Sequence, residues 1–131
     1  MIVVDASVLT PAVAGRETGS GGAIRHRMDG DEVSAPEIVD LEVVSALRGL
    51  VRGRVVTRER AEQALADLAT LPILRLPHLP LIERIWSLRD NVSAYDAAYV
   101  ALAEALGATL VTADARLARS PGIRCAVEVL V

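Results

Sequence analysis

The chain has 131 residues, of which 52% are hydrophobic, and its mean hydropathy is +0.38. This length suits one domain with one core, and this composition excludes a disordered chain. No apolar run reaches the ~20 residues of a membrane-spanning helix, and the start, Met1 to Asp5, lacks the basic and apolar parts of a signal peptide. Cys125 is the only cysteine, so no internal disulfide can form and we expect a cytoplasmic protein.

The charge balance leaves the class of partner open. The net charge is −3, and all 14 basic residues are arginines. An acidic chain is a poor general binder of nucleic acid, but four carboxylates masked by metal would leave it slightly positive. Aromatic residues make up only 2% of the chain, so a stacking platform for bases is not expected. Any nucleic acid would have to be held through its phosphates and a metal ion.

Strand and helix signals alternate along the chain. Short apolar or β-branched runs predict strands at residues 2–4, 32–35, 73–76, 108–112 and 126–129. Helical patterns lie between them, at residues 8–14, 23–28, 36–52, 58–71, 79–90, 95–106 and 115–118. This alternation predicts βαβ units, and therefore an α/β fold around a mainly parallel sheet of four to five short strands.

Capping and breaking residues set several of these boundaries. Pro36 suits the first position of its helix, Thr57 and Ser93 suit N-caps, and Gly107 suits a helix stop. The segment 15–22 ends in a glycine cluster and is predicted to be a loop. Its glycines do not have the spacing of a dinucleotide-binding fingerprint.

Acidic residues stand at positions where a parallel α/β sheet places its ligands. Asp5 and Asp114 follow two apolar strands, whose carboxyl ends would share one edge of the sheet. Asp96 lies in the first turn of the nearly apolar helix at 95–106 and is a third candidate. The helix at 36–52 offers both Asp40 and Glu42, and helical geometry alone does not choose between them.

Converging carboxylates predict a site for a divalent cation. Such groups raise one another's pKa values unless a cation with oxygen ligands keeps them ionised, as Mg²⁺ or Mn²⁺ would. His26 and His78 share no metal-ligand spacing with each other or with Cys125, so zinc is not expected. Each acid alone also has a structural explanation as a cap, a turn former, a strand end or a solvated residue. The pattern of acids therefore leaves both interpretations open.

Four segments together resemble the PIN-domain ribonucleases, and specifically the VapC toxins of bacterial type II toxin–antitoxin pairs. Their order and spacing carry the resemblance: VVDAS at 3–7, PEIVDLEV at 36–43, YDAAYVALA at 95–103 and LVTAD at 110–114. The resemblance covers essentially the whole chain. It implies a three-layer α/β/α fold made by one PIN domain over residues 1–131.

The resemblance also implies a site and a reaction. In that family four acids form the catalytic and metal-binding site, and the matching positions here are Asp5, Glu42, Asp96 and Asp114. This match selects Glu42 over Asp40, and it places Ser7 and Thr112 at positions that support the acids. The implied activity is Mg²⁺- or Mn²⁺-dependent hydrolysis of RNA by a metal-activated water.

The implied partners are RNA and a second protein. The resemblance implies a homodimer that a VapB antitoxin neutralises, in a heterotetramer or larger assembly, with an antitoxin arginine suited to the acidic cleft. Arg48 and Arg52 are i,i+4 neighbours on the helix that bears Glu42, and they are candidates to bind RNA phosphates. A solvated helix face explains these two arginines equally well.

Two other classes of function stay open. The first is a phosphatase or receiver-like α/β domain that uses an aspartate. Ser7 stands where a D-x-D pair would have its second aspartate, and the chain has no lysine to hold a phosphoryl group. The second is a non-catalytic module whose acids hold a partner's basic segment, which predicts no nuclease activity at millimolar Mg²⁺.

Overall fold

The computed structural model of the protein describes residues 1–15 and 20–130. These residues form one five-stranded sheet, in the order β3-β2-β1-β4-β5, in which all neighbouring strands are parallel. The strands are β1 Ile2–Val4, β2 Val33–Pro36, β3 Ile73–Leu76, β4 Thr109–Thr112 and β5 Val127–Val129. The predicted α/β fold with a parallel sheet of short strands is therefore confirmed.

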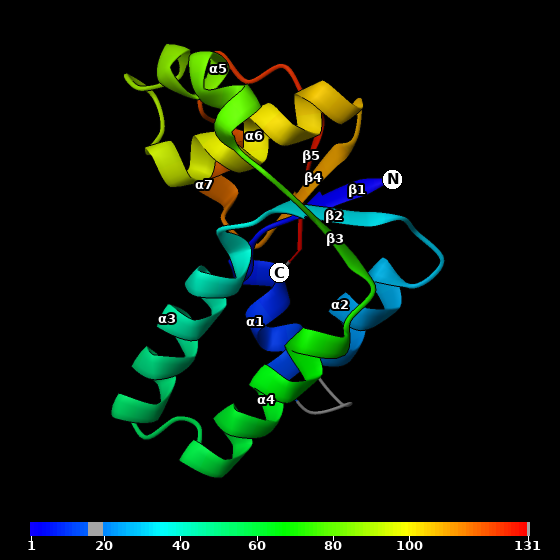
Figure 1. Ribbon diagram of the computed structural model, residues 1–131, viewed down its shortest axis with the longest axis vertical. Helices are drawn as coiled ribbons and strands as arrows, with labels where there is room; N and C mark the ends of the chain where they lie inside the picture. The colour runs from blue at the N-terminus through cyan, green and yellow to red at the C-terminus, as the bar shows by residue number, and fades with distance from the viewer. Residues whose placement is uncertain (16–19, 131) are drawn as a thin grey trace.

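Helices cover both faces of the sheet and complete three layers (Figure 1). The helical elements are α1 Ala6–Ala14, α2 Ser20–Met28, α3 Val39–Arg52, α4 Arg58–Thr70, the 3₁₀ turn η1 Leu79–Leu81, α5 Ile82–Ser87, α6 Ala94–Leu106 and α7 Ala115–Ala118. On one face α1 packs against β4 and is surrounded by α2, α3 and α4; on the other, α6 contacts β1, β2 and β4 beside α5. None of the helices in the described residues has the length and hydropathy needed to cross a membrane.

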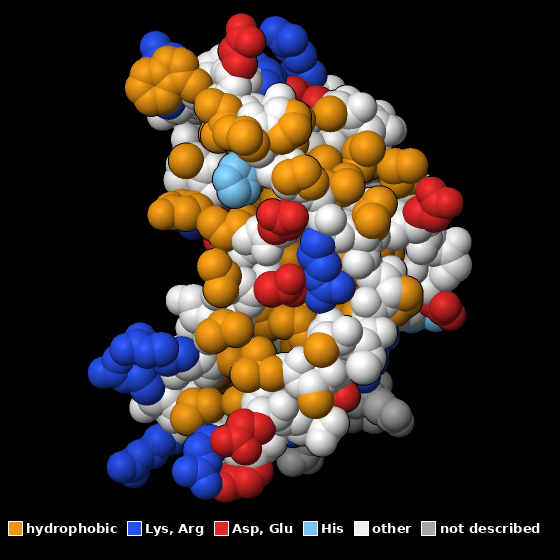
Figure 2. Space-filling model, in the orientation of Figure 1, with side chains coloured by type: hydrophobic (Ala, Val, Ile, Leu, Met, Phe, Trp, Pro, Cys, Tyr) orange, Lys and Arg blue, Asp and Glu red, His pale blue; other side chains and the backbone are white. Residues whose placement is uncertain are grey.

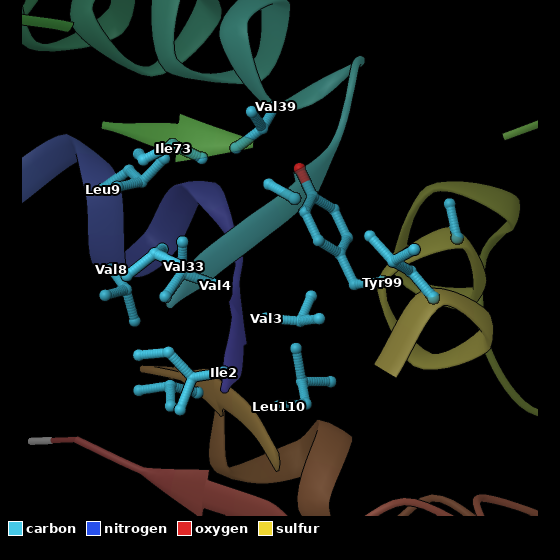
Figure 3. Packing of buried hydrophobic residues seen from close by; sticks show 14 of the residues in the cluster. Ile2, Val3, Val4, Val8, Leu9, Val33, Val39, Ile73, Tyr99 and Leu110 are labelled. Atoms are coloured by element: carbon cyan, nitrogen blue, oxygen red, sulfur yellow. The ribbon is translucent and has the colours of Figure 1, made fainter. Parts of the chain in front are cut away.

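The core lies on both faces of the middle strands. Every residue of β1 and β2 is buried, and α6 contributes an unbroken buried run from Ala97 to Ala103. Figure 3 shows Tyr99 of α6 on the same side of the sheet as Val3 and Leu110. Burial on both faces explains why these strands read as continuous apolar runs rather than as alternating ones.

The strand order of the sheet reverses direction at β1. The chain first adds β2 and β3 on one side of β1, and then returns through α5 and α6 to place β4 on the other side. A crevice outside the carboxyl ends of the strands forms at such a switch point, and ligands of open α/β sheets bind there. Asp5 directly follows β1 and Asp114 lies two residues beyond β4, so both acids stand beside this point.

Most predicted helix boundaries are confirmed by hydrogen bonds. The side chain of Thr57 accepts the N–H of Arg60 at 3.1 Å, and that of Ser93 accepts the N–H of Asp96 at 3.2 Å. Gly107 ends α6 in the left-handed region with φ 62°. Pro72 and Pro77 flank the outer strand β3.

The predictions for Pro36 and for the helix at 79–90 are wrong. Pro36 is the last residue of β2, and the following helix begins at Val39. The pairing of β2 with β1 involves Val33 and Ser34, so the backbone N–H that proline lacks is not needed for that pairing. The segment 79–90 forms the short turn η1 followed by α5, which ends at Ser87.

The prediction of a loop at residues 15–22 is also wrong at its C-terminal end. Residues 16–19 lie outside the described residues, whereas Gly21 and Gly22 belong to α2. Glycine has a low intrinsic helix propensity, but α2 packs along α1 and buries Ile24. Tertiary packing of this kind overrides propensity.

Two glycine substitutions are expected to change stability in opposite directions. Gly107→Ala should lower the free energy of unfolding by about 1 kcal/mol, because φ 62° is unfavourable for a residue with a Cβ. Gly49→Ala, in the middle of α3, should raise it by about 0.5–1 kcal/mol, because alanine is the better helix former. A Cβ at either position meets nothing within 4 Å, so backbone conformation alone decides the sign. Urea unfolding of both variants checks this, and two shifts of the same sign would contradict it.

Candidate active site

A small pocket opens at the carboxyl ends of β1 and β4. It has a volume of about 180 Å³ and is lined by Asp5, Ala6, Ser7, Glu42, Asp96, Tyr99 and Asp114. Its acids come from four separate parts of the chain: the end of β1, the first turn of α3, the first turn of α6 and the segment after β4. The structure therefore brings all four carboxylates named from the sequence to one pocket, at the switch point of the sheet.

Asp5 is buried, and two hydroxyl groups hold its carboxylate. Ser7 Oγ donates to Asp5 Oδ1 and Thr112 Oγ1 donates to Oδ2, each at 2.5 Å. Each hydroxyl oxygen in turn accepts a backbone N–H, from Ala113 at 2.8 Å and from Asp114 at 3.0 Å. Burial raises the pKa of Asp5 even though these hydrogen bonds act to lower it. Both residues expected to support the acids therefore contact Asp5 itself.

Glu42, and not Asp40, faces the pocket from α3. The Tyr99 hydroxyl donates a hydrogen bond to Glu42 Oε1. Asp40 lies outside the pocket lining and pairs with Arg75 of β3, with 2.9 Å between Oδ1 and Nη2. Burial raises the pKa of Glu42; the hydrogen bond from Tyr99 lowers it, and the nearby carboxylates raise it further.

Asp96 and Asp114 complete the acidic lining in two different environments. Burial raises the pKa of Asp96, and the negative charge of Asp114 adds to that rise. Asp114 has a lowered pKa, because the Arg116 guanidinium donates to Oδ1 and Oδ2 at 3.2 Å each. The backbone N–H of Arg116 also donates to Asp114 Oδ1, at 2.9 Å.

The carboxylates share a pocket without forming a preformed ligand cage. Within residues 1–15 and 20–130, no three His, Cys, Asp or Glu side chains are grouped closely enough to hold one metal ion as they stand. Three of the pocket acids are instead turned toward protein donors: Asp5 toward two hydroxyls, Glu42 toward Tyr99, and Asp114 toward Arg116. Closer approach of these like charges is unfavourable without a cation between them.

The two arginines proposed from the sequence to bind RNA do not line the pocket. Arg48 and Arg52 are exposed on α3. They lie six and ten residues beyond Glu42, which is roughly 9 and 15 Å along the helix axis at 1.5 Å per residue. Figure 2 shows basic side chains gathered over the far end of α3 and α4. These arginines are therefore neighbours of the pocket and not part of its lining.

Two side chains at the site were not predicted from the sequence. Tyr99 lies three residues after Asp96, a spacing that places both on one face of α6, and this spacing was the available signal. Arg116 is the second residue of α7, and it pairs with Asp114, the N-cap residue of the same helix. No pattern in the sequence predicts this ion pair.

A family model described as the PIN domain matches residues 2–123. The chain is 42% identical to ribonuclease VapC1 of Mycobacterium tuberculosis over 130 residues, which is 98% of this chain and 96% of that protein. It is 40% identical to ribonuclease VapC9 of the same organism over 130 residues, which is 99% and 98% of the two chains.

Two solved structures share the fold. The crystal structure of PAE2754 from Pyrobaculum aerophilum has a TM-score of 0.65 and 26% sequence identity, covering 90% of this chain and 84% of that one. Mycobacterium tuberculosis VapC20, described as a toxin that cleaves the sarcin–ricin loop, has a TM-score of 0.67 over 95% of this chain and 97% of its own. Its sequence identity is 17%, so it supports the fold alone.

The protein is a three-layer α/β domain built around a parallel sheet, and the family model matches nearly its whole length. The chain therefore belongs to the PIN-domain family. Within that family it is similar, over nearly its whole length, to proteins named VapC ribonucleases. The resemblance seen in the sequence is therefore confirmed.

The raised pKa of Asp5 predicts the effect of Asp5→Asn on stability. A carboxyl group whose pKa is raised by folding favours the folded state below its ordinary value of 3.8, and this contribution is lost as the pH rises through the folded-state pKa. Asp5→Asn removes the buried charge, so it should raise the unfolding temperature of metal-free protein at pH 7 to 8. The gain should shrink toward pH 4, in calorimetric scans with EDTA.

Asp31→Asn is the matched control with the opposite sign. The Met1 amino group and Arg27 lower the pKa of Asp31, so its charge stabilises the fold above its ordinary value of 3.8. This substitution should lower the unfolding temperature at neutral pH and have less effect at acid pH. An Asp5→Asn variant that behaves like Asp31→Asn would show that the charge of Asp5 is not costly.

Proposed function

We propose that the chain is a Mg²⁺- or Mn²⁺-dependent endoribonuclease, the toxin of a VapBC toxin–antitoxin pair, which hydrolyses RNA phosphodiester bonds. One observation carries this proposal: the four carboxylates converge on one pocket at the switch point of the sheet. Relatives that match over nearly the whole chain, at 42% and 40% identity, are named ribonucleases. We place the activity in the cytoplasm.

The chemistry of the pocket suits a hard divalent cation. The carboxylate and hydroxyl groups of its lining side chains all offer oxygen, which is the ligand that Mg²⁺ and Mn²⁺ prefer. Burial raises the pKa values of Asp5, Glu42 and Asp96, so a positive charge among them would stabilise their ionised forms. We assign both metal binding and catalysis to the same four residues, Asp5, Glu42, Asp96 and Asp114.

A bound ion of this kind supplies a water of lowered pKa and neutralises charge on the scissile phosphate. The protein contributes the positions of the carboxylates. Ser7 and Thr112 orient both oxygens of Asp5. Asp96 lies in the first turn of α6, where the helix dipole favours negative charge. Arg116 balances the charge of Asp114 through an exposed ion pair, which is weak enough for a cation to replace.

The basic end of α3 is the proposed path of the RNA strand. Arg48 and Arg52 extend from the pocket along α3, and Arg54 is exposed in the turn that follows. Guanidinium groups bind phosphate oxygens without reading the base, and they position a strand whose cleavage depends on the acids. We therefore assign Arg48 and Arg52 to binding of the RNA backbone.

We propose two protein partners, a second copy of the chain and a VapB-type antitoxin, in a heterotetramer or larger assembly. Leu74, Leu79, Ile82 and Trp86 expose apolar surface on β3, η1 and α5. Hydrophobic side chains are spread over this part of the molecule in Figure 2, and apolar surface of this kind favours contact with another protein. The pair of Arg116 with Asp114 supports an antitoxin arginine in the pocket, because it is an example of a guanidinium bound to one of the acids.

The pocket disfavours the phosphatase and receiver-like alternatives. Ser7, where a D-x-D pair would have its second aspartate, uses its hydroxyl to orient Asp5. The chain has no lysine to pair with a phosphoryl group. A non-catalytic acidic module remains the competing proposal, and the presence or absence of cleavage separates the two.

Asp5→Asn and Asp96→Asn should each lower the rate of RNA cleavage more than about a hundredfold, because each removes a proposed ligand of the catalytic ion. Cleavage of a fluorescent RNA at millimolar Mg²⁺ measures the rate, and circular dichroism checks the fold. Asp40→Asn is the matched control, since it removes a carboxylate on α3 outside the pocket. An Asp96→Asn variant as active as the parent would refute the site assignment.

The activity itself is best tested on protein freed from any antitoxin. Incubation with total cellular RNA should give new 5′ and 3′ ends with Mg²⁺ and none with EDTA. Sequencing of those ends identifies the RNA and the cut position. No cleavage by antitoxin-free protein at millimolar Mg²⁺ would favour the non-catalytic binding module.

Arg48→Ala and Arg52→Ala should weaken RNA binding, because each removes a guanidinium proposed to bind a phosphate. Each should raise KM several-fold with little change in kcat, and should reduce the slope of log KM against log salt by about 0.7, the value for one phosphate of a single strand. Arg89→Ala is the control, because Arg89 is exposed and its guanidinium lies 4.6 Å from the Trp86 ring centre, outside α3. Equal effects of all three substitutions would argue against a phosphate path along α3.

A further inference from the structure

Tyr99 joins the hydrophobic core to the acidic pocket. It is 1% exposed, and it is among the largest fully buried side chains of the protein. Figure 3 shows its ring between α6 and the sheet, with the hydroxyl pointing away from α6 toward the side where Val39 lies. Asp96, three residues earlier on α6, lines the same pocket. One face of α6 therefore carries both an acid and a buried hydroxyl group.

Packing alone does not account for the hydroxyl of Tyr99. Its buried neighbours along α6, from Ala97 to Leu102, are otherwise all apolar. A buried hydroxyl costs free energy unless it finds a partner, and a phenylalanine would fill the same space without that cost. The partner it finds is Glu42 Oε1, on another element and 57 residues away in the sequence.

The carboxylate of Glu42 accepts fewer hydrogen bonds from the protein than the carboxylate of Asp5 does. Asp5 accepts hydrogen bonds from two hydroxyls, whereas the hydrogen bond from Tyr99 is the one that the structure shows for the Glu42 carboxylate among the described residues. Glu42 lines the pocket but is only half-buried, and a glutamate side chain has three rotatable bonds. Without a donor, its carboxylate is free to turn toward solvent and away from the other acids.

We propose that Tyr99 is a positioning residue that holds Glu42 toward the pocket and so completes the set of carboxylates for the cation. This inference rests on the proposed function for the role of the cation. Its support is the hydrogen bond between α6 and α3, the burial of the ring that fixes the hydroxyl, and the place of both side chains in the pocket lining. Residues that orient a metal ligand typically change metal affinity or activity about 10–100-fold when they are removed.

The test is Tyr99→Phe, which keeps the ring and removes the hydroxyl. We expect Mn²⁺ binding, measured by calorimetry on the full chain without RNA, to weaken about tenfold. The kcat for RNA cleavage should fall while KM stays close to that of the parent. Tyr95→Phe is the matched control: it is the same chemical change on the same helix, at a residue that is 59% exposed and outside the pocket lining. An unchanged Mn²⁺ affinity in Tyr99→Phe overturns the proposal.

A double-mutant cycle separates positioning from a general structural effect. If Tyr99 acts through Glu42, then Tyr99→Phe should cause no further loss of Mn²⁺ affinity in the Glu42→Gln background. The same loss in both backgrounds overturns the proposal. If Tyr99→Phe fails to fold, Glu42→Asp is the substitute test. It withdraws the carboxylate from an unchanged Tyr99, so Mn²⁺ binding should weaken similarly. Retained Mn²⁺ affinity in Glu42→Asp overturns the proposal.

The readouts also distinguish this inference from the proposed function. Mn²⁺ binding that depends on Tyr99, in a parent that cleaves no RNA, supports the positioning role and refutes the nuclease assignment. RNA cleavage by the parent, together with Mn²⁺ binding that Tyr99→Phe leaves unchanged, supports the nuclease assignment and overturns the positioning role. A parent that does not bind Mn²⁺ overturns both.

Discussion

The buried carboxylate of Asp5 is the constraint on which the rest of the site depends. It follows an entirely buried strand, where an ionised group is costly unless it is hydrogen-bonded. Its two donors, Ser7 and Thr112, come from α1 and β4. Asp5 is therefore satisfied only when β1 pairs with β4 and α1 begins directly after β1. The hydrogen bonds that make the charge tolerable also fix the strand ends at the switch point.

The other acids follow from this arrangement, each with a different balance of burial and partners. Glu42 is half-buried with one hydroxyl donor, Asp96 lies at a helix start, and Asp114 is paired with an exposed arginine. Burial raises the pKa values of Asp5, Glu42 and Asp96, which means that folding places negative charge where it is unfavourable. Ionisation of these acids therefore lowers the stability of the metal-free protein, and under the proposed function a bound cation would offset this cost.

The sequence predicts those features of the fold that depend on local pattern. The apolar strands and the capped helices are visible because burial and capping are properties of adjacent residues. The convergence of Asp5 and Asp114 is predictable because parallel strands end at a common edge. The prediction that Pro36 begins a helix is wrong because a proline is tolerated at the end of β2, where the pairing with β1 involves only Val33 and Ser34. The helix pattern did not separate Asp40 from Glu42, because the partner that occupies Asp40 is Arg75, which lies on β3 35 residues away.

The short outer strands of the sheet have a consequence for unwanted self-association. β3 has four residues and β5 has three, so neither edge offers a long row of backbone groups to a strand of another molecule. Pro72 and Pro77 flank β3 and lack an N–H, and Arg75 adds a charge within the strand. The exposed apolar side chains near this edge, Leu74 and Leu79, can therefore serve side-chain contacts with a partner without offering a template for fibre growth.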